Sequence, residues 1–361
     1  MLEGWVRIPS GCAIAGIINQ NGQAFSGEMI ARAMTVMHDR SNGLGGGFAG
    51  YGIYPEMKEA YAFHVLAQDK TGISQVDELF KENFTVILKE PLPTRRTAGV
   101  AGTPFLMRYF LQPQKENADA DQLVAATTLQ INKHIGGTFV LSGAKNMGVF
   151  KGVGYPEDIA AFFRLDEYKG YLWTGHGRFP TNTPGWWGGA HPFSLLDVTL
   201  VHNGEISSYG ANRRYLESQG YHMTLQTDSE AIAYACDFLH RRHQLPWEII
   251  AKVFAPPHWW EIDRMPAEER ELAVALRRTY GSLLMNGPFS IIVGFAGGMM
   301  ALNDRLKLRS LVAAQNEEWV FVASEEAAIR AVCPEPESVW YPKGGEAVIQ
   351  LVKENVECHA A

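Results

Sequence analysis

The sequence predicts an α+β fold in which sheets pack together and are covered by helices. Short apolar strands lie near both ends of the 361-residue chain, and helical patterns lie between them. Near the amino terminus, the apolar run at residues 13–18 ends in turn residues at 19–22. Near the carboxyl terminus, residues 287–302 indicate two buried strands around a Gly297-Gly298 turn.

The other elements follow from periodicity and from turn or capping residues. Thr227 and Glu230 have the spacing of a capping box, so a helix is predicted to begin there and to continue to Leu239. A strand at residues 198–202 ends in a predicted Asn203-Gly204 turn. Further helices are predicted at residues 28–37, 121–134 and 261–280, a strand–turn–strand unit at 139–149, and strands at 310–314, 319–323 and 347–352.

Composition excludes several classes of protein. The formal net charge is -7, which argues against nucleic-acid binding, because a binding face would need clustered Lys and Arg. The four cysteines are far apart and form no CxxC pair, so neither a zinc site nor a disulfide framework is expected. The first eleven residues lack the apolar core of a secretory signal, and residues 287–302 are too short and glycine-rich to span a membrane. A reducing cytoplasm is the expected location.

One segment contains a candidate nucleophile, and another contains residues that could bind a carboxylate. Cys12 stands at the head of the first apolar strand, where it is either a buried structural cysteine or a nucleophile. Arg178 is followed by Thr181 and Asn182 in a loop rich in Gly and Pro. A guanidinium binds a carboxylate through two parallel hydrogen bonds, so this loop suits carboxylate recognition, although an ordinary polar turn would look similar.

Two further segments complete a possible site. The Asn203 amide and the Gly204 backbone N–H can converge on one oxygen, as in an oxyanion hole, although Asn-Gly is also a common hairpin turn. Asp228 falls in the first turn of a predicted helix and could receive the α-amino group of an amino acid. Helix capping explains Asp228 equally well, and the two roles are compatible.

Taken together, these segments resemble the class II glutamine amidotransferases, a branch of the N-terminal nucleophile hydrolases. They are most similar to the amidotransferase domain of the glutamate synthase large subunit. The likeness is carried by GHGRFPTNTPGWWGGAHPF (residues 175–193), VHNGEIS (201–207), LNDRLKLRSL (302–311) and VASEEAAI (322–329). The resemblance implies a four-layer αββα sandwich of two antiparallel sheets, forming a single domain over residues 12–361. Residues 55–140 match none of the family's motifs and are expected to hold insertions.

The resemblance also implies roles for individual residues. Cys12 is similar to the nucleophile, and Asn203 with Gly204 to the oxyanion-hole pair. The implied substrate-binding residues are Arg178 for the α-carboxylate, Thr181 and Asn182 beside it, Asp228 for the α-amino group, and Arg40 of a short HDRS segment. No metal and no cofactor are implied, and His176, His191 and His202 are interpreted as hydrogen-bonding loop residues too scattered to form a metal site.

The family's chemistry needs Cys12 at the amino terminus. The α-amino group of the nucleophile serves as the base, with a pKa of about 7.7–8.0, whereas an internal amide nitrogen cannot take a proton because its lone pair is delocalised. Residues 1–11 are therefore predicted to be a leader that is removed by cleavage of the Gly11–Cys12 bond. The eleven residues before Cys12 are one departure from the family. Ala13 is another, because glycine usually follows the family's nucleophile.

The resemblance implies a glutamine-hydrolysing subunit that acts through a thioester. No segment for a synthase, flavin or iron–sulfur cluster is recognised, so ammonia is expected to pass to a separate glutamate synthase-like subunit that carries the flavin and iron–sulfur groups. Two alternatives stay open. One is a hydrolase acting on another amide. The other is a catalytically silent regulatory or scaffolding subunit that retains the glutamine pocket.

Overall fold

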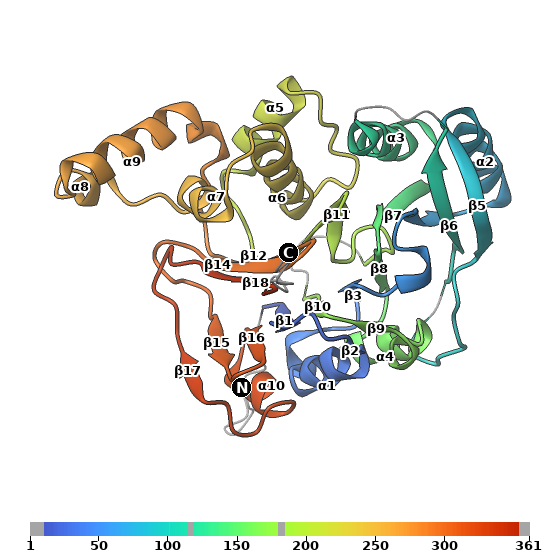
Figure 1. Cartoon of the computed structure of the whole chain (residues 1–361), viewed down its shortest axis with the longest axis horizontal. Coiled ribbons are helices and arrows are strands. Elements are labelled where there is room, and N and C mark those ends of the chain that lie inside the picture. Colours follow the sequence, from blue (N-terminus) through green and yellow to red (C-terminus); the bar gives the residue numbers. More distant parts are fainter. Residues whose placement is uncertain (1–10, 101, 115–118, 180–184, 354–361) are drawn as a thin grey trace, which may run out of the picture.

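Two antiparallel sheets are stacked face to face, and helices cover the outer face of each (Figure 1). The computed structural model describes residues 11–100, 102–114, 119–179 and 185–353. This is the predicted four-layer αββα sandwich, and the α+β fold class is confirmed.

The first sheet has seven strands in the order β17-β15-β16-β1-β10-β3-β8. Its strands come from both ends of the chain, as the sequence predicts. The central strand β1 is buried at every residue and pairs with β10 on one side and β16 on the other. In chain order the strands are β1 (Ala13–Asn19), β3 (Gly46–Tyr51), β8 (Met147–Gly152), β10 (Leu172–Gly177), β15 (Val312–Gln315), β16 (Trp319–Ala323) and β17 (Ser338–Trp340).

The second sheet has five strands in the order β11-β12-β13-β14-β18. The predicted pair of buried strands is confirmed as the β13–β14 hairpin, in which Gly297 adopts a positive φ of 81°. Strands β1 and β10 of the first sheet pack on β12 and β13 of the second. The strands are β11 (Phe193–Leu195), β12 (Val198–Gly204), β13 (Phe289–Phe295), β14 (Gly298–Asn303) and β18 (Val348–Leu351).

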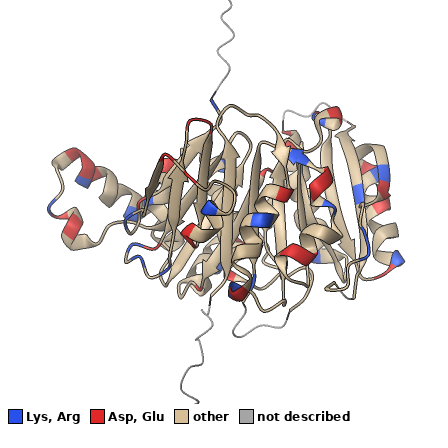
Figure 2. Cartoon of the chain, turned by 90° about the horizontal axis from the view of Figure 1, so that it is seen from below, with Lys and Arg blue, Asp and Glu red and all other residues tan. Residues whose placement is uncertain are grey.

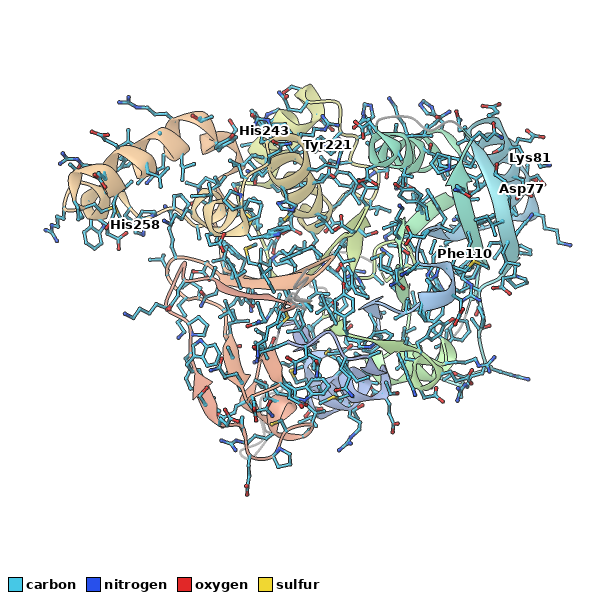
Figure 3. All side chains as sticks on the ribbon, in the orientation of Figure 1. Asp77, Lys81, Phe110, Tyr221, His243 and His258 are labelled. Carbon is cyan, nitrogen blue, oxygen red and sulfur yellow. The ribbon has the colours of Figure 1, made fainter. Side chains whose placement is uncertain are left out.

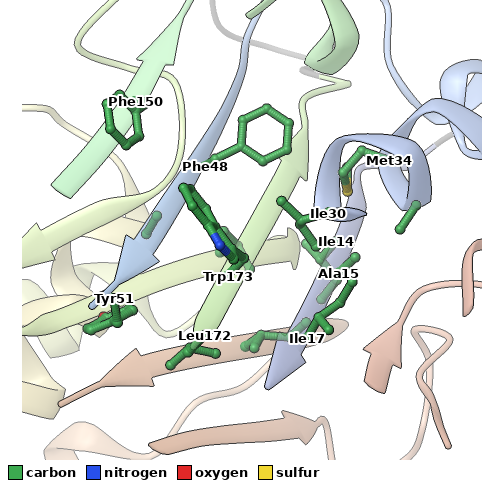
Figure 4. Packing of buried hydrophobic residues seen from close by; sticks show 14 of the residues in the cluster. Ile14, Ala15, Ile17, Ile30, Met34, Phe48, Tyr51, Phe150, Leu172 and Trp173 are labelled. Atoms are coloured by element: carbon green, nitrogen blue, oxygen red, sulfur yellow. The ribbon is translucent and has the colours of Figure 1, made fainter. Parts of the chain in front are cut away.

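Helices close both outer faces. Helix α1 packs on β1 and β10, α4 on β3 and β8, and α10 on β16, whereas α6 packs on β11 and β12. Figure 4 shows Ile30 and Met34 of α1 beside strand β1, with Trp173 and Phe48 nearby, and Met34 lies against Gly175 of β10. The helices are α1 (Glu28–Val36), α4 (Pro156–Phe162) and α10 (Glu326–Arg330) on the first sheet, and α5 (Tyr209–Ser218), α6 (Asp228–Asp237) and α7 (Trp247–Phe254) on the side of the second.

A third sheet, with order β5-β6-β4-β7, extends the molecule beyond β11. Helices α2 and α3 pack on it, and Figure 3 marks α2 through the side chains of Asp77 and Lys81. The third sheet falls largely within residues 55–140, where insertions are expected. That these residues are insertions stays a prediction. Its elements are β4 (Tyr61–Ala67), α2 (Lys70–Asn83), β5 (Phe84–Pro91), β6 (Phe105–Pro113), α3 (Ala120–His134) and β7 (Thr138–Lys145), and a separate short pair joins β2 (Phe25–Ser26) to β9 (Lys169–Gly170).

The strand–turn–strand unit predicted at 139–149 is confirmed, because β7 and β8 are separated only by a turn at Asn146, although β7 pairs with β4 and β8 with β3. Two other local predictions are wrong. Asn203 and Gly204 do not turn the chain, because both continue β12 and pair with Ser290 and Phe289 of β13. The helix expected at residues 261–280 is divided into α8 (Trp259–Ile262) and α9 (Ala267–Thr279), because Pro266 cannot continue a helix from the preceding turn. Helices α8 and α9 form an arm that extends from the body of the molecule (Figure 1 and Figure 2).

Candidate active site

The strand register places Cys12 beside Arg178. Ala13 of β1 pairs with Gly177 of β10, so Cys12 and Arg178 are the next residues at this end of the two strands. The Cys12 sulfur accepts a hydrogen bond from the backbone N–H of Phe179 at 3.3 Å. The methyl group of Ala13 is not crowded by its partner strand, because even a Cβ added to Gly177 would lie 3.5 Å from it, an ordinary contact distance.

Burial raises the pKa of the Cys12 thiol, and the N–H of Phe179 and the charges of Arg178 and Arg309 offset only part of this increase. The thiol is therefore mainly protonated at neutral pH. A base must take its proton before the sulfur can act as a nucleophile.

The glycine-rich segment before and within β3 holds Arg178 in place. The N–H of Arg178 donates to the Gly45 carbonyl at 2.8 Å, and the Ser41 hydroxyl donates to the Arg178 carbonyl at 3.2 Å. A Cβ on Gly45 would lie 3.0 Å from the Arg178 side chain, and one on Gly47 would lie 2.2 Å from the His191 carbonyl oxygen. Glycine is needed at positions 45 and 47 because a side chain there would crowd Arg178 or the His191 carbonyl.

Asn203 and Gly204 approach Cys12 from the second sheet. The Asn203 side chain is buried, and neither its Oδ1 nor its Nδ2 has a hydrogen-bond partner among the described residues. The Oδ1 lies 3.4 Å from the position that a Cβ on Gly11 would take, so the amide is next to the Gly11–Cys12 peptide. Gly204 has a φ of +151°, and a Cβ there would lie 2.1 Å from the Pro288 carbonyl oxygen. A buried, unpartnered amide suits a site where a polar ligand completes its hydrogen bonds.

Asp228 lies at the start of α6, as predicted. Thr227 is the N-cap residue, and its hydroxyl accepts from the Ser229 N–H at 3.3 Å. The capping box is incomplete, because the Glu230 carboxylate accepts from the Thr224 and Leu225 N–H groups instead. Asp228 Oδ2 accepts from the Ile206 N–H at 2.9 Å, which joins α6 to the chain just after β12.

A cavity of about 260 Å³ brings these segments together. This volume is just below the range typical of drug-sized ligands and suits a small molecule such as an amino acid. Of the predicted site residues, Cys12, Arg178, Gly204 and Asp228 line it. The sequence did not predict the remaining lining residues: Phe179, Trp186, Gly189, His191, His202, Glu205, Ile206, Tyr209, Leu225, Gln226, Thr227 and Ser229.

Three predicted substrate residues are not among the described residues that line the cavity. Thr181 and Asn182 lie outside the described residues. Arg40 forms an ion pair with Glu325, and its Nη1 lies 3.8 Å from a Cβ position on Gly11. Arg40 is thus near the bond predicted to be cleaved rather than in the wall of the cavity as the structure describes it.

The interpretation of the three histidines as scattered loop residues is wrong for His176 and His202, whereas His191 does lie in a loop, before β11. His176 is in β10 and His202 in β12, and the His176 ring stacks on His191 with 4.0 Å between ring centroids. All three are buried; His191 and His202 line the cavity, whereas His176 is not among its lining residues. Among the described residues, no group of three or more His, Cys, Asp or Glu is arranged to hold a metal ion.

A buried lysine lies behind the same wall of the cavity. Lys151 of β8 is 2% exposed, donates a hydrogen bond to the Gly188 carbonyl at 3.1 Å, and lies 4.5 Å from the centre of the Phe193 ring. Burial lowers its pKa from 10.5 to about 7. The charged form is thus less stable in the folded protein than in the unfolded chain.

Replacing Lys151 with Met is expected to stabilise the protein by about 2 kcal/mol at pH 6, after the loss of one carbonyl hydrogen bond is allowed for. Between pH 7 and about 10 the folded wild type binds fewer protons at this site than the unfolded chain. Wild-type stability therefore rises with pH, and the advantage of the variant shrinks by ~1.4 kcal/mol per pH unit. Urea unfolding of both proteins at pH 6 and pH 9 tests this, and a difference that does not change with pH would contradict it.

One family of known proteins matches more than half of the chain. The sequence matches the family Glutamine amidotransferases class-II over residues 97–329, a span that includes Arg178, Asn203, Gly204 and Asp228. The chain belongs to this family. Within the described residues, no helix has the length and apolar character required to cross a membrane.

Individual relatives differ in similarity. An uncharacterized protein of Archaeoglobus fulgidus is 52% identical over 95% of this chain and 92% of its own length. A putative glutamine amidotransferase of Methanothermobacter thermautotrophicus is 28% identical over 89% of this chain and 93% of its own length. The solved glutamine phosphoribosylpyrophosphate amidotransferase of B. subtilis has 14% identity and a TM-score of 0.46, covering 95% of this chain, which spans 50% of that protein.

Proposed function

We propose that the protein hydrolyses the side-chain amide of glutamine, with Cys12 as nucleophile after removal of residues 1–11, and supplies ammonia to a separate synthase. The observation that supports this most directly is the shared cavity: a thiol, a guanidinium and a carboxylate from three segments face one amino-acid-sized space. Arg178 binds the α-carboxylate through its guanidinium, and Asp228 binds the α-ammonium group.

The reaction proceeds through a thioester. The Cys12 α-amine takes the thiol proton, and the sulfur attacks the amide carbon of the substrate. A carbon–sulfur bond forms, and negative charge develops on the amide oxygen, where the Asn203 amide and the Gly204 N–H donate hydrogen bonds. The carbon–nitrogen bond then breaks, and the leaving nitrogen departs as ammonia with the proton held by the amine. Water, deprotonated by the same amine, hydrolyses the thioester to glutamate.

The acceptor of ammonia is proposed on the resemblance to glutamate synthase. We assign the acceptor site to another polypeptide of the glutamate synthase type, with flavin and iron–sulfur groups. Co-purification from the native host, followed by identification of the bound polypeptide, tests this assignment. A partner without a synthase domain would overturn it.

Replacing Asn203 with Ala is expected to lower kcat for glutamine by about 100- to 1000-fold with little change in KM, because the amide acts on charge that develops only in the transition state. Steady-state measurement of ammonia release gives both constants. Asn303, another buried Asn whose side-chain atoms have no partner among the described residues, lies on β14 and supplies the matched control Asn303→Ala. An equal loss in both variants would argue against the oxyanion role.

A second function has one observation in its favour. In the chain with its leader, Gly11 is joined to Cys12 and lies against Asn203 and Arg309. The nitrogen of Cys12 is then part of a peptide bond and cannot act as the base for the thiol. A protein that kept residues 1–11 would be a silent glutamine-binding subunit. Intact-mass analysis of the protein from its native host separates the two functions.

A further inference from the structure

We propose that Ser229, held by His191 and His202, is a positioning residue that orients Asp228 toward the α-ammonium group of the substrate. This inference rests on the proposed function and deepens it, because it assigns the selection of α-amino acids to a buried network rather than to a single carboxylate.

Ser229 lies at the meeting point of three segments. Its side chain is 1% exposed, with the hydroxyl oxygen 2.8 Å from His191 Nε2, 3.0 Å from His202 Nδ1 and 3.3 Å from Asp228 Oδ1. All four residues line the cavity. The loop before β11, strand β12 and helix α6 are thereby joined through one oxygen atom.

The proton arrangement at this oxygen follows from donor counting. A hydroxyl donates one proton and accepts at two lone pairs, whereas an ionised carboxylate only accepts. If Ser229 donated to either histidine, its contact with Asp228 would place two oxygen lone pairs against each other. All three contacts are satisfied when His191 Nε2–H and His202 Nδ1–H donate to Ser229 and Ser229 donates to Asp228.

The histidines are neutral, as this arrangement requires. Burial lowers the pKa values of both His191 and His202 below the usual range, so each ring has one N–H at neutral pH. His176 supports both residues: its ring stacks on the His191 ring, and its Nε2–H donates to the backbone carbonyl of His202 at 2.9 Å. Burial also lowers the pKa of His176 to about 3, consistent with a neutral donor.

The network completes the hydrogen bonds of the Asp228 carboxylate on the protein side. Oδ2 accepts from the Ile206 N–H, and Oδ1 accepts from the hydroxyl groups of Ser229 and Thr227, the latter at 3.2 Å. These donors hold the carboxylate in one orientation. An ammonium group that enters the cavity therefore meets a fixed negative charge.

The test compares two ligands that differ only in the α-amine: L-glutamine and glutaramate, which lacks the amino group. Binding is measured by calorimetry in a Cys12→Ala background, so that no turnover occurs. Ser229→Ala is expected to weaken L-glutamine binding about tenfold or more, as is usual when a hydrogen bond to a charged group is lost. Glutaramate binding is expected to change less than about twofold, because this ligand has no ammonium group to interact with Asp228.

Two further variants keep the test decisive. Ser229→Cys keeps a side chain of the same shape and slightly larger volume but donates poorly, so it should weaken L-glutamine binding in the same way even if the Ala variant folds badly. Ser142→Ala removes a comparably buried hydroxyl, one that accepts from the Val149 N–H in the sheet region, and should leave both ligands unaffected.

The outcomes separate this inference from the proposed function. Equal weakening of both ligands, or no weakening of L-glutamine by either Ser229 variant, overturns the positioning role and leaves glutamine hydrolysis standing. Failure of L-glutamine to bind the protein that retains Ser229 overturns the proposed function, and this inference with it.

Discussion

Replacing Cys12 with Ala is expected to lower the rate of ammonia release from glutamine by about 10⁵-fold or more, the scale seen when an enzyme loses its covalent nucleophile. The cavity keeps Arg178 and Asp228, so glutamine binding should persist. Ammonia release and calorimetric binding, measured on the same preparation, test both parts of this expectation.

The chain offers a matched control for the same chemical change. Cys236 is fully buried in α6 and is not among the residues that line the cavity. Cys236→Ala should retain the wild-type rate, apart from any loss of folded protein. If Cys12→Ala retained more than a small fraction of the rate, another nucleophile would have to be sought.

Exposing the amine of Cys12 is expected to raise the hydrolysis rate by about 100- to 10,000-fold over the chain that retains residues 1–11. The reason is the protonated thiol: burial raises its pKa, and an amide nitrogen cannot serve as its base. A fusion cut directly before Cys12 supplies the first form, and intact mass confirms each terminus. Ammonia release is then compared at equal protein concentration.

A form that begins at Gly11 is the sharpest control for the leader experiment. It has a free amine and lacks nearly all of the leader, but its basic nitrogen belongs to the wrong residue. It should be as inactive as the full chain. Full activity in either longer form would show that some other group takes the thiol proton, and the proposed mechanism would fail.

Much of the framework could be predicted from the sequence because its signals are local. The apolar run at β1, the Gly297-Gly298 turn and the helix start at Thr227 each depend on neighbouring residues. The motif segments indicated Cys12, Arg178, Gly204 and Asp228, which the structure places around one cavity.

The rest depends on contacts between distant segments. Strands β4, β5 and β6 of the third sheet were not predicted. β4 is buried throughout and β5 is exposed along most of its length, so neither alternates between a buried and an exposed face. The histidine cluster was missed for the same kind of reason: His176, His191 and His202 meet only because β10 and β12 face each other across the two sheets. The turn predicted at Asn203-Gly204 is wrong because pairing with β13 keeps this common turn dipeptide extended.

The junction of β7 and β8 has a mechanical consequence. Only Asn146 separates a strand of the third sheet from a strand of the seven-stranded sheet, and its backbone and side chain are tied to Gly52 and Tyr54. The third sheet is therefore joined to the strand that follows Cys12 by an unbroken path of backbone and strand pairing, from β8 through β3 and β10 to β1. A change in the orientation of the third sheet would have to be accommodated at Asn146 or passed on to β8.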